Sequence, residues 1–152
     1  MKSPSLLTKI GRFVFLLVLV NLIGYIASSY MTPSTMAWYR TLPVSSLNPP
    51  DSIFGAVWGI LFFLQAIAAF LVWGKASPRS FVLQLALNML WSFSFFYLRN
   101  PALALIVLIF FILALIANIN TFSKAKRIAG WLMVPTLLWA FFAFYLNAVI
   151  VF

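Results

Sequence analysis

Five long apolar stretches dominate the chain, and each is long enough to cross a lipid bilayer as a helix. They cover residues of about 10–30, 52–73, 79–98, 101–122 and 128–152. An α-helix rises about 1.5 Å per residue, so about 20 apolar residues cross a hydrocarbon layer of about 30 Å. The pattern predicts an all-α polytopic membrane protein, a bundle of five transmembrane helices that forms one domain over residues 1–152.

The segments between these stretches contain residues that end or start helices. They are Gly74-Lys75 with Ser77-Pro78, then Arg99-Asn100-Pro101, then Lys124, Lys126 and Arg127. Glycine and proline end or start helices, and basic side chains belong outside the hydrocarbon layer. The first stretch resembles a signal peptide, but no convincing small-residue cleavage site follows it. We therefore expect it to be retained as the first helix.

Residues 31–51 form the longest connection, and its four prolines and many hydroxyl residues predict a loop with turns. Trp38, Tyr39 and Leu42 suit a loop that folds back at the membrane interface, over the bundle. The sequence Asn48-Pro49-Pro50-Asp51-Ser52 predicts the start of the second helix. Asp51 is the expected N-cap, with Ser52 as the alternative.

Three of the predicted helices have a face that combines amide and aromatic side chains. These faces hold Asp51, Gly55, Trp58, Phe62 and Gln65 in the second span, Gln84, Asn88, Trp91, Ser92 and Phe95 in the third, and Trp131, Pro135, Trp139, Ala143 and Asn147 in the fifth. One interpretation is hydrogen bonding between helices, with tryptophans as interfacial anchors. The other is an apolar pocket with few polar groups, suited to flat aromatic ligands. Trp58, Trp91 and Trp139 lie well inside their spans, which argues against anchoring for these three.

The first and fourth spans are expected to be mainly structural. Asn21, Tyr25 and Ser28 share one face of the first span. Lipid would leave the amide of Asn21 without partners, so we expect this face to pack against other helices.

The charged residues are few and strongly biased towards one sign. Hydrophobic residues make up 65% of the chain, charged residues 7%, and the net charge is +9. The positive-inside rule places most of these charges on the cytoplasmic side, with Arg40 and Arg99 opposite. The members of the cytoplasmic group are Lys2, Lys9, Arg12, Lys75, Arg79, Lys124, Lys126 and Arg127. We therefore expect a bacterial cell membrane protein with its N-terminus in the cytoplasm and its C-terminus outside. The basic residues flank the spans and form no stripe on a soluble face, so they indicate contact with the bilayer and not with nucleic acid.

The chain lacks the residues on which several kinds of chemistry depend. It has no histidine and no cysteine, and its one acid, Asp51, sits at a helix end. Proton-driven transporters need a titratable group within the membrane, which argues against this class. Hydrolase and metalloenzyme sites lack their residues as well, and haem ligation would be left to methionine or tyrosine. We expect no required cofactor and no metal site.

A series of short motifs over most of the chain resembles one known family. They are Trp38-Tyr39, Pro49-Pro50-Asp51, Phe54-Gly55, Val57-Trp58, Gln84, Leu87-Asn88, Trp91-Ser92, Phe95-Phe96, Pro135, Trp139, Ala143 and Leu146-Asn147. In this order they resemble the TspO/MBR family of tryptophan-rich sensory proteins and translocator proteins, also called peripheral benzodiazepine receptors. The resemblance extends from Gly24 to Asn147.

The resemblance implies a five-helix bundle that is commonly a homodimer and that binds porphyrins, haem included, or benzodiazepine-type ligands, and in some members cholesterol. It also implies a pocket between the helices and under the first loop. By position this pocket would contain Trp38, Trp58, Phe62, Asn88, Trp91, Trp139, Ala143 and Asn147. Some positions depart from the family pattern. Val44, Ser45 and Leu47 stand in place of a Lys-Pro-Ser-Trp segment, and Phe62 and Thr136 stand where the family often has tyrosine.

These observations favour a receptor or carrier for porphyrins and other flat hydrophobic ligands, possible sterols included. The alternative is an enzyme that degrades porphyrin with light or oxygen, as the resemblance implies for some relatives. Transport of the ligand is a third hypothesis, and the sequence does not separate it from binding.

Overall fold

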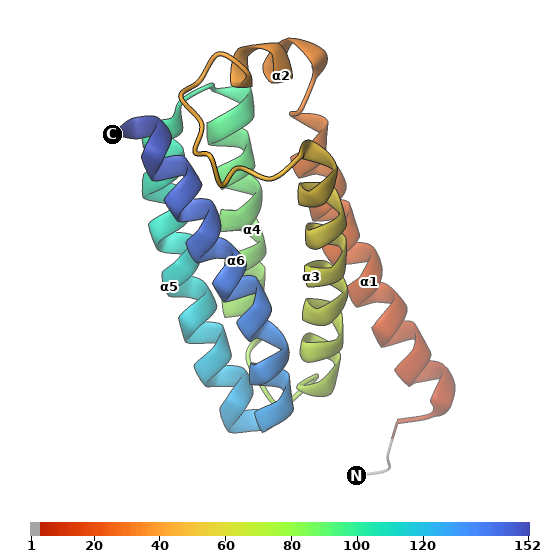
Figure 1. Ribbon diagram of the computed structural model, residues 1–152. Coiled ribbons are helices and arrows are strands. Elements are labelled where there is room, and N and C mark those ends of the chain that lie inside the picture. The colour runs from red at the N-terminus through yellow and green to blue at the C-terminus, as the bar shows by residue number, and fades with distance from the viewer. Residues whose placement is uncertain (1–3) are drawn as a thin grey trace.

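The computed structural model describes residues 4–152, and within them it contains helices and no strands (Figure 1). The elements are α1 (Leu6–Ser29), α2 (Pro33–Tyr39), α3 (Asp51–Leu71), α4 (Pro78–Ser92), the π-helical turn η1 (Phe93–Tyr97), α5 (Pro101–Ala125) and α6 (Arg127–Val151). Five helices of this part are long and apolar enough to cross a membrane, when η1 is counted with α4. The predicted five-helix bundle is thereby confirmed.

The helices begin and end within a few residues of the predicted bounds, and the differences have local causes. Helix α1 starts earlier than expected because the side chain of Ser5 caps it, accepting a hydrogen bond from the amide of Thr8 at 3.2 Å. Helix α5 runs on past the apolar stretch to Ala125 and carries Lys124 in its last turn. Hydropathy locates the membrane-crossing part of a helix, and polar residues can extend the helix beyond it.

The first connection contains a helix that the prediction of a loop with turns missed. Thr32 accepts from the amide of Thr35 at 3.2 Å, and Pro33 occupies the first helical position of α2. Threonine followed by proline is a standard helix start. Figure 1 shows α2 lying across one end of the bundle, on the side of the C-terminus, as the predicted fold-back of this segment requires.

The prediction of Asp51 as an N-cap was wrong. Pro50 occupies the cap position, makes no side-chain cap hydrogen bond, and leaves Asp51 as the first residue inside α3. A carboxylate in the first turn still interacts favourably with the positive end of the helix. Asp51 also lies 3.8 Å from the guanidinium of Arg40.

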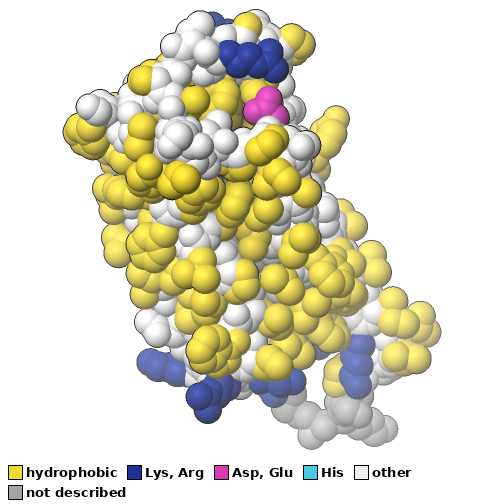
Figure 2. All heavy atoms as spheres, in the orientation of Figure 1, with side chains coloured by type: hydrophobic (Ala, Val, Ile, Leu, Met, Phe, Trp, Pro, Cys, Tyr) yellow, Lys and Arg dark blue, Asp and Glu magenta, His cyan; other side chains and the backbone are white. Residues whose placement is uncertain are grey.

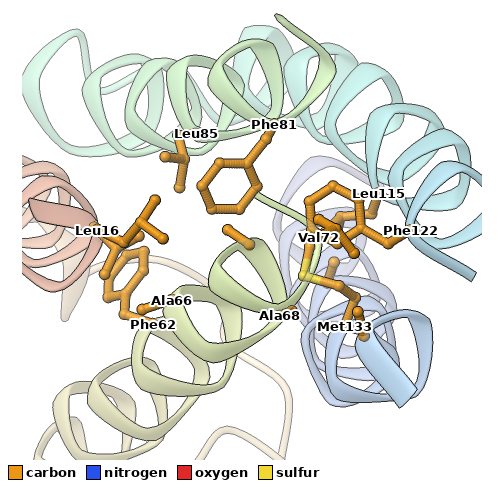
Figure 3. Close-up of a cluster of buried hydrophobic side chains, with 14 of the residues drawn as sticks. Leu16, Phe62, Ala66, Ala68, Val72, Phe81, Leu85, Leu115, Phe122 and Met133 are labelled. Carbon is orange, nitrogen blue, oxygen red and sulfur yellow. The ribbon is translucent and has the colours of Figure 1, made fainter. Parts of the chain in front are cut away.

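The core lies between α3, α4, α5 and α6, and α1 touches it along one edge. Figure 3 shows Phe81, Phe122, Val72 and Met133 converging from four different segments. Helix α1 contributes only Leu16 and Val20 as buried residues, and its N-terminal end diverges from the bundle (Figure 1).

A chain of buried amides crosses the middle of the bundle. Gln84 donates to Gln65 at 2.8 Å, Gln65 donates to Thr136 at 3.3 Å, and Asn118 donates to Gln84 at 3.0 Å. All four side chains are fully buried. These bonds join α3, α4, α5 and α6, so for Gln65 and Gln84 the interpretation as helix–helix hydrogen bonding is confirmed.

Charged side chains lie at the two ends of an apolar belt (Figure 2). The start of α1, the α3–α4 connection and the α5–α6 connection lie together at one end and carry most of the basic residues. Lys2, which belongs to the predicted cytoplasmic group, lies outside the described residues. Arg40, Arg99 and the single acid Asp51, drawn magenta, lie at the other end. The separation of charges follows the predicted alternation.

Candidate ligand site

Two hollows lie beneath α2. The outer hollow has a volume of about 450 Å³ and opens between α1, α3 and α4. The inner hollow, of about 70 Å³, lies between α2, α3, α4, η1 and α6. The outer hollow is lined by Asn21, Gly24, Tyr25, Ala27, Ser28, Met31, Asp51, Phe54, Gly55, Trp58, Gly59, Phe62, Asn88, Trp91 and Ser92. The inner hollow is lined by Met31, Met36, Tyr39, Asp51, Phe54, Trp58, Trp91, Phe95, Phe96, Ala143, Leu146, Asn147 and Ile150.

Trp58 and Trp91 line both hollows, as do Met31, Asp51 and Phe54, and we call the two tryptophans the wall of the site. Their ring centroids are 6.3 Å apart with the planes inclined at 37°. Trp58 also packs against Phe62, at a centroid distance of 5.5 Å. Adjacent aromatic faces of this kind suit a flat ligand, because aromatic pairs gain energy beyond their buried area.

Hydrogen bonds hold Trp91 in place. Its indole nitrogen donates to the Oδ1 of Asn147 at 3.3 Å, and the Nδ2 of Asn147 donates to the carbonyl of Pro101 at 2.9 Å. Asn147 therefore links α4, α5 and α6 while it also lines the inner hollow.

Asn88 lines the outer hollow and carries a buried polar group that no protein atom uses. Its side chain is 3% exposed, and its Nδ2 has no hydrogen-bond partner within residues 4–152. A buried donor without an acceptor costs about 1–3 kcal/mol, so an acceptor atom on a ligand would recover that energy. The hydroxyl of nearby Ser92 is already used, since it donates to the carbonyl of Ala27 at 2.8 Å.

The polar face of α1 lines the outer hollow, and two predictions about α1 were wrong. Asn21, Tyr25 and Ser28 do not pack against other helices, and Tyr25 is 73% exposed. Asn21 donates to its own helix instead, at the carbonyl of Leu17 at 2.8 Å. This bond satisfies part of the amide without a second helix. The first span is therefore part of the lining, whereas in the described chain α5 contributes no residue to either hollow.

Six of the eight predicted pocket residues line a hollow. Phe62 and Asn88 face the outer hollow, Ala143 and Asn147 the inner one, and the two wall tryptophans both. The other two lie behind the lining. Trp38 packs against Phe95 at 5.9 Å, and Trp139 packs against Phe54 at 5.8 Å. Direct ligand contact by Trp38 and Trp139 stays a prediction.

The turn η1 places Phe95 and Phe96 in the lining of the inner hollow; sequence reasoning put Phe95 on the polar and aromatic face of the third span but did not assign Phe96 to the site. The amide of Leu98 donates to the carbonyl of Phe93, five residues back, at 3.0 Å. This π-helical bond buries three consecutive residues, Ser94, Phe95 and Phe96. A regular α-helix would turn one of the three away, and π-turns often occur at functional sites. The pattern of apolar residues does not reveal such a turn.

Two hydrogen bonds hold the first connection in place, one within the connection and one to α6. Tyr39 donates to the Oδ1 of Asn48 at 3.0 Å, and Ser45 lies 3.1 Å from the hydroxyl of Tyr145 on α6. Burial raises the pKa of the Tyr39 hydroxyl above its ordinary value; the hydrogen bond with Asn48 opposes this, and the charge of Asp51 adds to it. Tyr39 therefore remains protonated and able to donate at neutral pH.

Comparison of the sequence with known proteins identifies the family of the chain. The model of the TspO/MBR family matches residues 15–152. The chain belongs to the TspO/MBR family. It is 34% identical over 134 residues to the tryptophan-rich protein TspO of Chlorobaculum tepidum, which covers 82% of this chain and 84% of that protein. It is 32% identical to the Archaeoglobus fulgidus protein of the same name, over 90% and 92% of the two chains.

A human relative carries the name translocator protein. It is 30% identical to this chain over 132 residues, covering 81% of this chain and 78% of the human one. The TspO/MBR resemblance that the sequence motifs indicated is thus confirmed over nearly the whole chain, and with it the assignment as an integral, multi-pass membrane protein.

Proposed function

We propose that this TspO/MBR chain is a membrane receptor or carrier that binds porphyrins and similar flat, hydrophobic molecules in the two hollows. The observation that carries the proposal is the unused Nδ2 of Asn88 beside the wall of Trp58 and Trp91. Aromatic faces with one free donor suit a flat, apolar ring that carries an acceptor atom. Binding of this kind needs no cofactor.

The test is a titration of the purified protein with protoporphyrin IX, followed by tryptophan fluorescence. We expect saturable quenching, and at least about a tenfold weaker affinity in the double variant Trp58→Phe with Asn88→Ala, which removes one stacking face and one donor. The matched control is Trp131→Phe, because Trp131 is 62% exposed on the outside of α6. An unchanged affinity in the double variant would show that the hollows are not the site.

Light-dependent degradation of porphyrin is the second candidate function. It is supported by the two wall tryptophans, whose centroids are 6.3 Å apart and which both border the hollows. A porphyrin excited by light would lie against side chains that can be oxidised. The test is product analysis under illumination, with Trp58→Phe as the variant. Degradation at the rate of free porphyrin in detergent would exclude the function.

The mode of action and the placement in the membrane are part of the same proposal. Apart from Lys9 and Arg12 in the first two turns of α1, the charged residues of the described helices lie in a first or last turn. Any transfer of the ligand would therefore run without proton coupling in the middle of the spans. The charge distribution supports a cytoplasmic N-terminus and an outward C-terminus in a bacterial cell membrane.

We also propose a homodimer, which chemical cross-linking in native membranes would reveal as a doubled mass.

A further inference from the structure

The lining of the two hollows contains no basic side chain within the part of the chain that the structure describes. Its one charged residue is Asp51, which borders both hollows and whose side chain is 54% exposed. We call the exposed end of the hollows at Asp51 the mouth. A ligand that carries a carboxylate would therefore meet a like charge at the mouth and amide donors inside. Burying an unpaired carboxylate among apolar side chains is costly, so such a group must remain at the mouth.

Arg40 is the basic residue that lies beside Asp51 at this mouth. The two side chains are 3.8 Å apart, and both are well exposed, at 71% and 54%. An exposed ion pair of this length contributes little to stability. The negative charge of Asp51 needs little stabilisation from Arg40, because the carboxylate already lies at the positive end of α3. The guanidinium is therefore free to exchange one carboxylate for another.

The backbone of Arg40 is fixed although its side chain is exposed. Its amide closes α2 by donating to the carbonyl of Met36 at 3.1 Å. The preceding Tyr39 packs against Phe95 and Phe96 of η1, with centroids 6.0 and 6.2 Å away. The backbone and Cβ of Arg40 therefore keep a fixed position relative to the inner hollow.

We propose that Arg40 is a binding residue for a carboxylate of the ligand, and that Asp51 holds its guanidinium at the mouth until the ligand arrives. The apolar ring enters the hollows, and its carboxylate stays outside and replaces Asp51 on Arg40. Guanidinium and carboxylate form two parallel hydrogen bonds, a better arrangement than the present long contact. The site therefore prefers flat molecules that carry a carboxylate over uncharged ones. This inference rests on the proposed function.

The other basic residue at this end of the described chain provides a matched control. Arg99 donates to the hydroxyl of Ser34 at 3.2 Å and lines neither hollow. Arg99→Gln removes the same charge as Arg40→Gln from the same end of the molecule. A general effect of net charge would change both variants alike.

The experiment compares protoporphyrin IX with its dimethyl ester. Both are titrated into protein held in nanodiscs of uncharged phosphatidylcholine, and empty nanodiscs correct for partition into lipid. The measured quantity is the ratio of acid affinity to ester affinity. We expect Arg40→Gln to lower this ratio about tenfold, as the loss of a charge-assisted hydrogen bond predicts. Arg99→Gln should leave the ratio as in the wild type, and Asp51→Asn should raise it by removing the competing carboxylate.

The outcomes separate the two proposals. Saturable binding of both compounds with an equal ratio in wild type and Arg40→Gln would overturn the role of Arg40 and leave the proposed function standing. An equal loss for acid and ester in Arg40→Gln would make Arg40 a structural residue of the mouth, which also overturns the inference. Absence of saturable quenching with either compound would refute the proposed function and this inference with it.

Discussion

The indole nitrogen of Trp91 donates to the Oδ1 of Asn147 across 3.3 Å and so ties α4 to α6 at the wall of the site. The other end of the same amide holds the first carbonyl of α5, at Pro101. One side chain thereby hydrogen-bonds to groups on two neighbouring helices. The shape of the site and the stability of the bundle depend on the same asparagine.

Replacing Asn147 by leucine should destabilise the protein by about 1–3 kcal/mol, because it leaves the buried indole N–H of Trp91 without a partner and removes the hydrogen bond to the carbonyl of Pro101. Unfolding in detergent micelles measures the loss. Asn21→Leu is the control, since Asn21 is exposed and donates only to a carbonyl of its own helix. Equal stability of the two variants would contradict the structural role of Asn147.

Gly24 allows α1 to approach α3, and Gly24→Ala should separate them. A Cβ at Gly24 would lie 2.5 Å from the ring of Phe62. We expect a loss of about 1–3 kcal/mol in the free energy of unfolding, as for other overpacked sites. The second change Phe62→Leu should restore most of it. At Gly55 a Cβ meets nothing within 4 Å, so Gly55→Ala should fold as the wild type does; a loss as large as that of Gly24→Ala would refute the packing argument.

The buried amides should behave as a unit. Gln65→Leu and Gln84→Leu each leave the partner amide unsatisfied, whereas the double variant removes both amides. We expect the double-mutant cycle to give a coupling of about 0.5–2 kcal/mol. Gln65→Leu combined with Asn147→Leu serves as the reference pair, because these residues share no hydrogen-bond partner. Additive effects in the Gln65 and Gln84 cycle would contradict a connected chain.

The absence of cysteine from the chain makes its orientation straightforward to measure. Ser5→Cys precedes α1, and Ser46→Cys lies in the connection between α2 and α3. With the N-terminus in the cytoplasm, an impermeant maleimide added to intact cells should label Ser46→Cys and leave Ser5→Cys unlabelled. The reverse pattern would show that the positive-inside rule fails for this chain.

The raised pKa of Tyr39 makes the stability of the first connection sensitive to alkali. The unfolded chain releases this proton first as pH rises, so the stability that Tyr39 contributes is complete below about pH 10 and is lost as pH passes its higher folded value. Unfolding midpoints measured at increasing pH should fall less steeply in Tyr39→Phe than in the wild type. Parallel curves for the wild type and Tyr39→Phe would refute the effect.

Apolar length predicted the five spans well because the membrane fixes how long an apolar helix must be. It predicted neither α2 nor the cap of α3, where prolines and hydroxyl residues permit both a turn and a helix. The side chain of Thr32, which caps α2, and the ring of Pro33, which fits its first turn, together favour the helix over the turn. At α3 the second of two prolines takes the cap position and moves Asp51 inside.

The periodic faces predicted part of the lining, and the packing of the helices in three dimensions determined the rest. Gln65 and Asn88 belong to similar faces, yet Gln65 meets another amide and Asn88 meets a hollow. Nothing in the spacing distinguishes them. The expectation for Asn21 failed because a helical side chain can donate to a carbonyl one turn earlier and so needs no second helix.

The turn η1 carries one residue more than an α-helical turn, and one residue rotates a helix by about 100°. Its length therefore sets the direction in which the chain enters α5. Loss of any one residue from 93–97 would swing the Pro101 carbonyl away from Asn147, even if every remaining side chain were kept. In this segment the number of residues matters as much as their identity, so a single deletion here should do more harm than most substitutions.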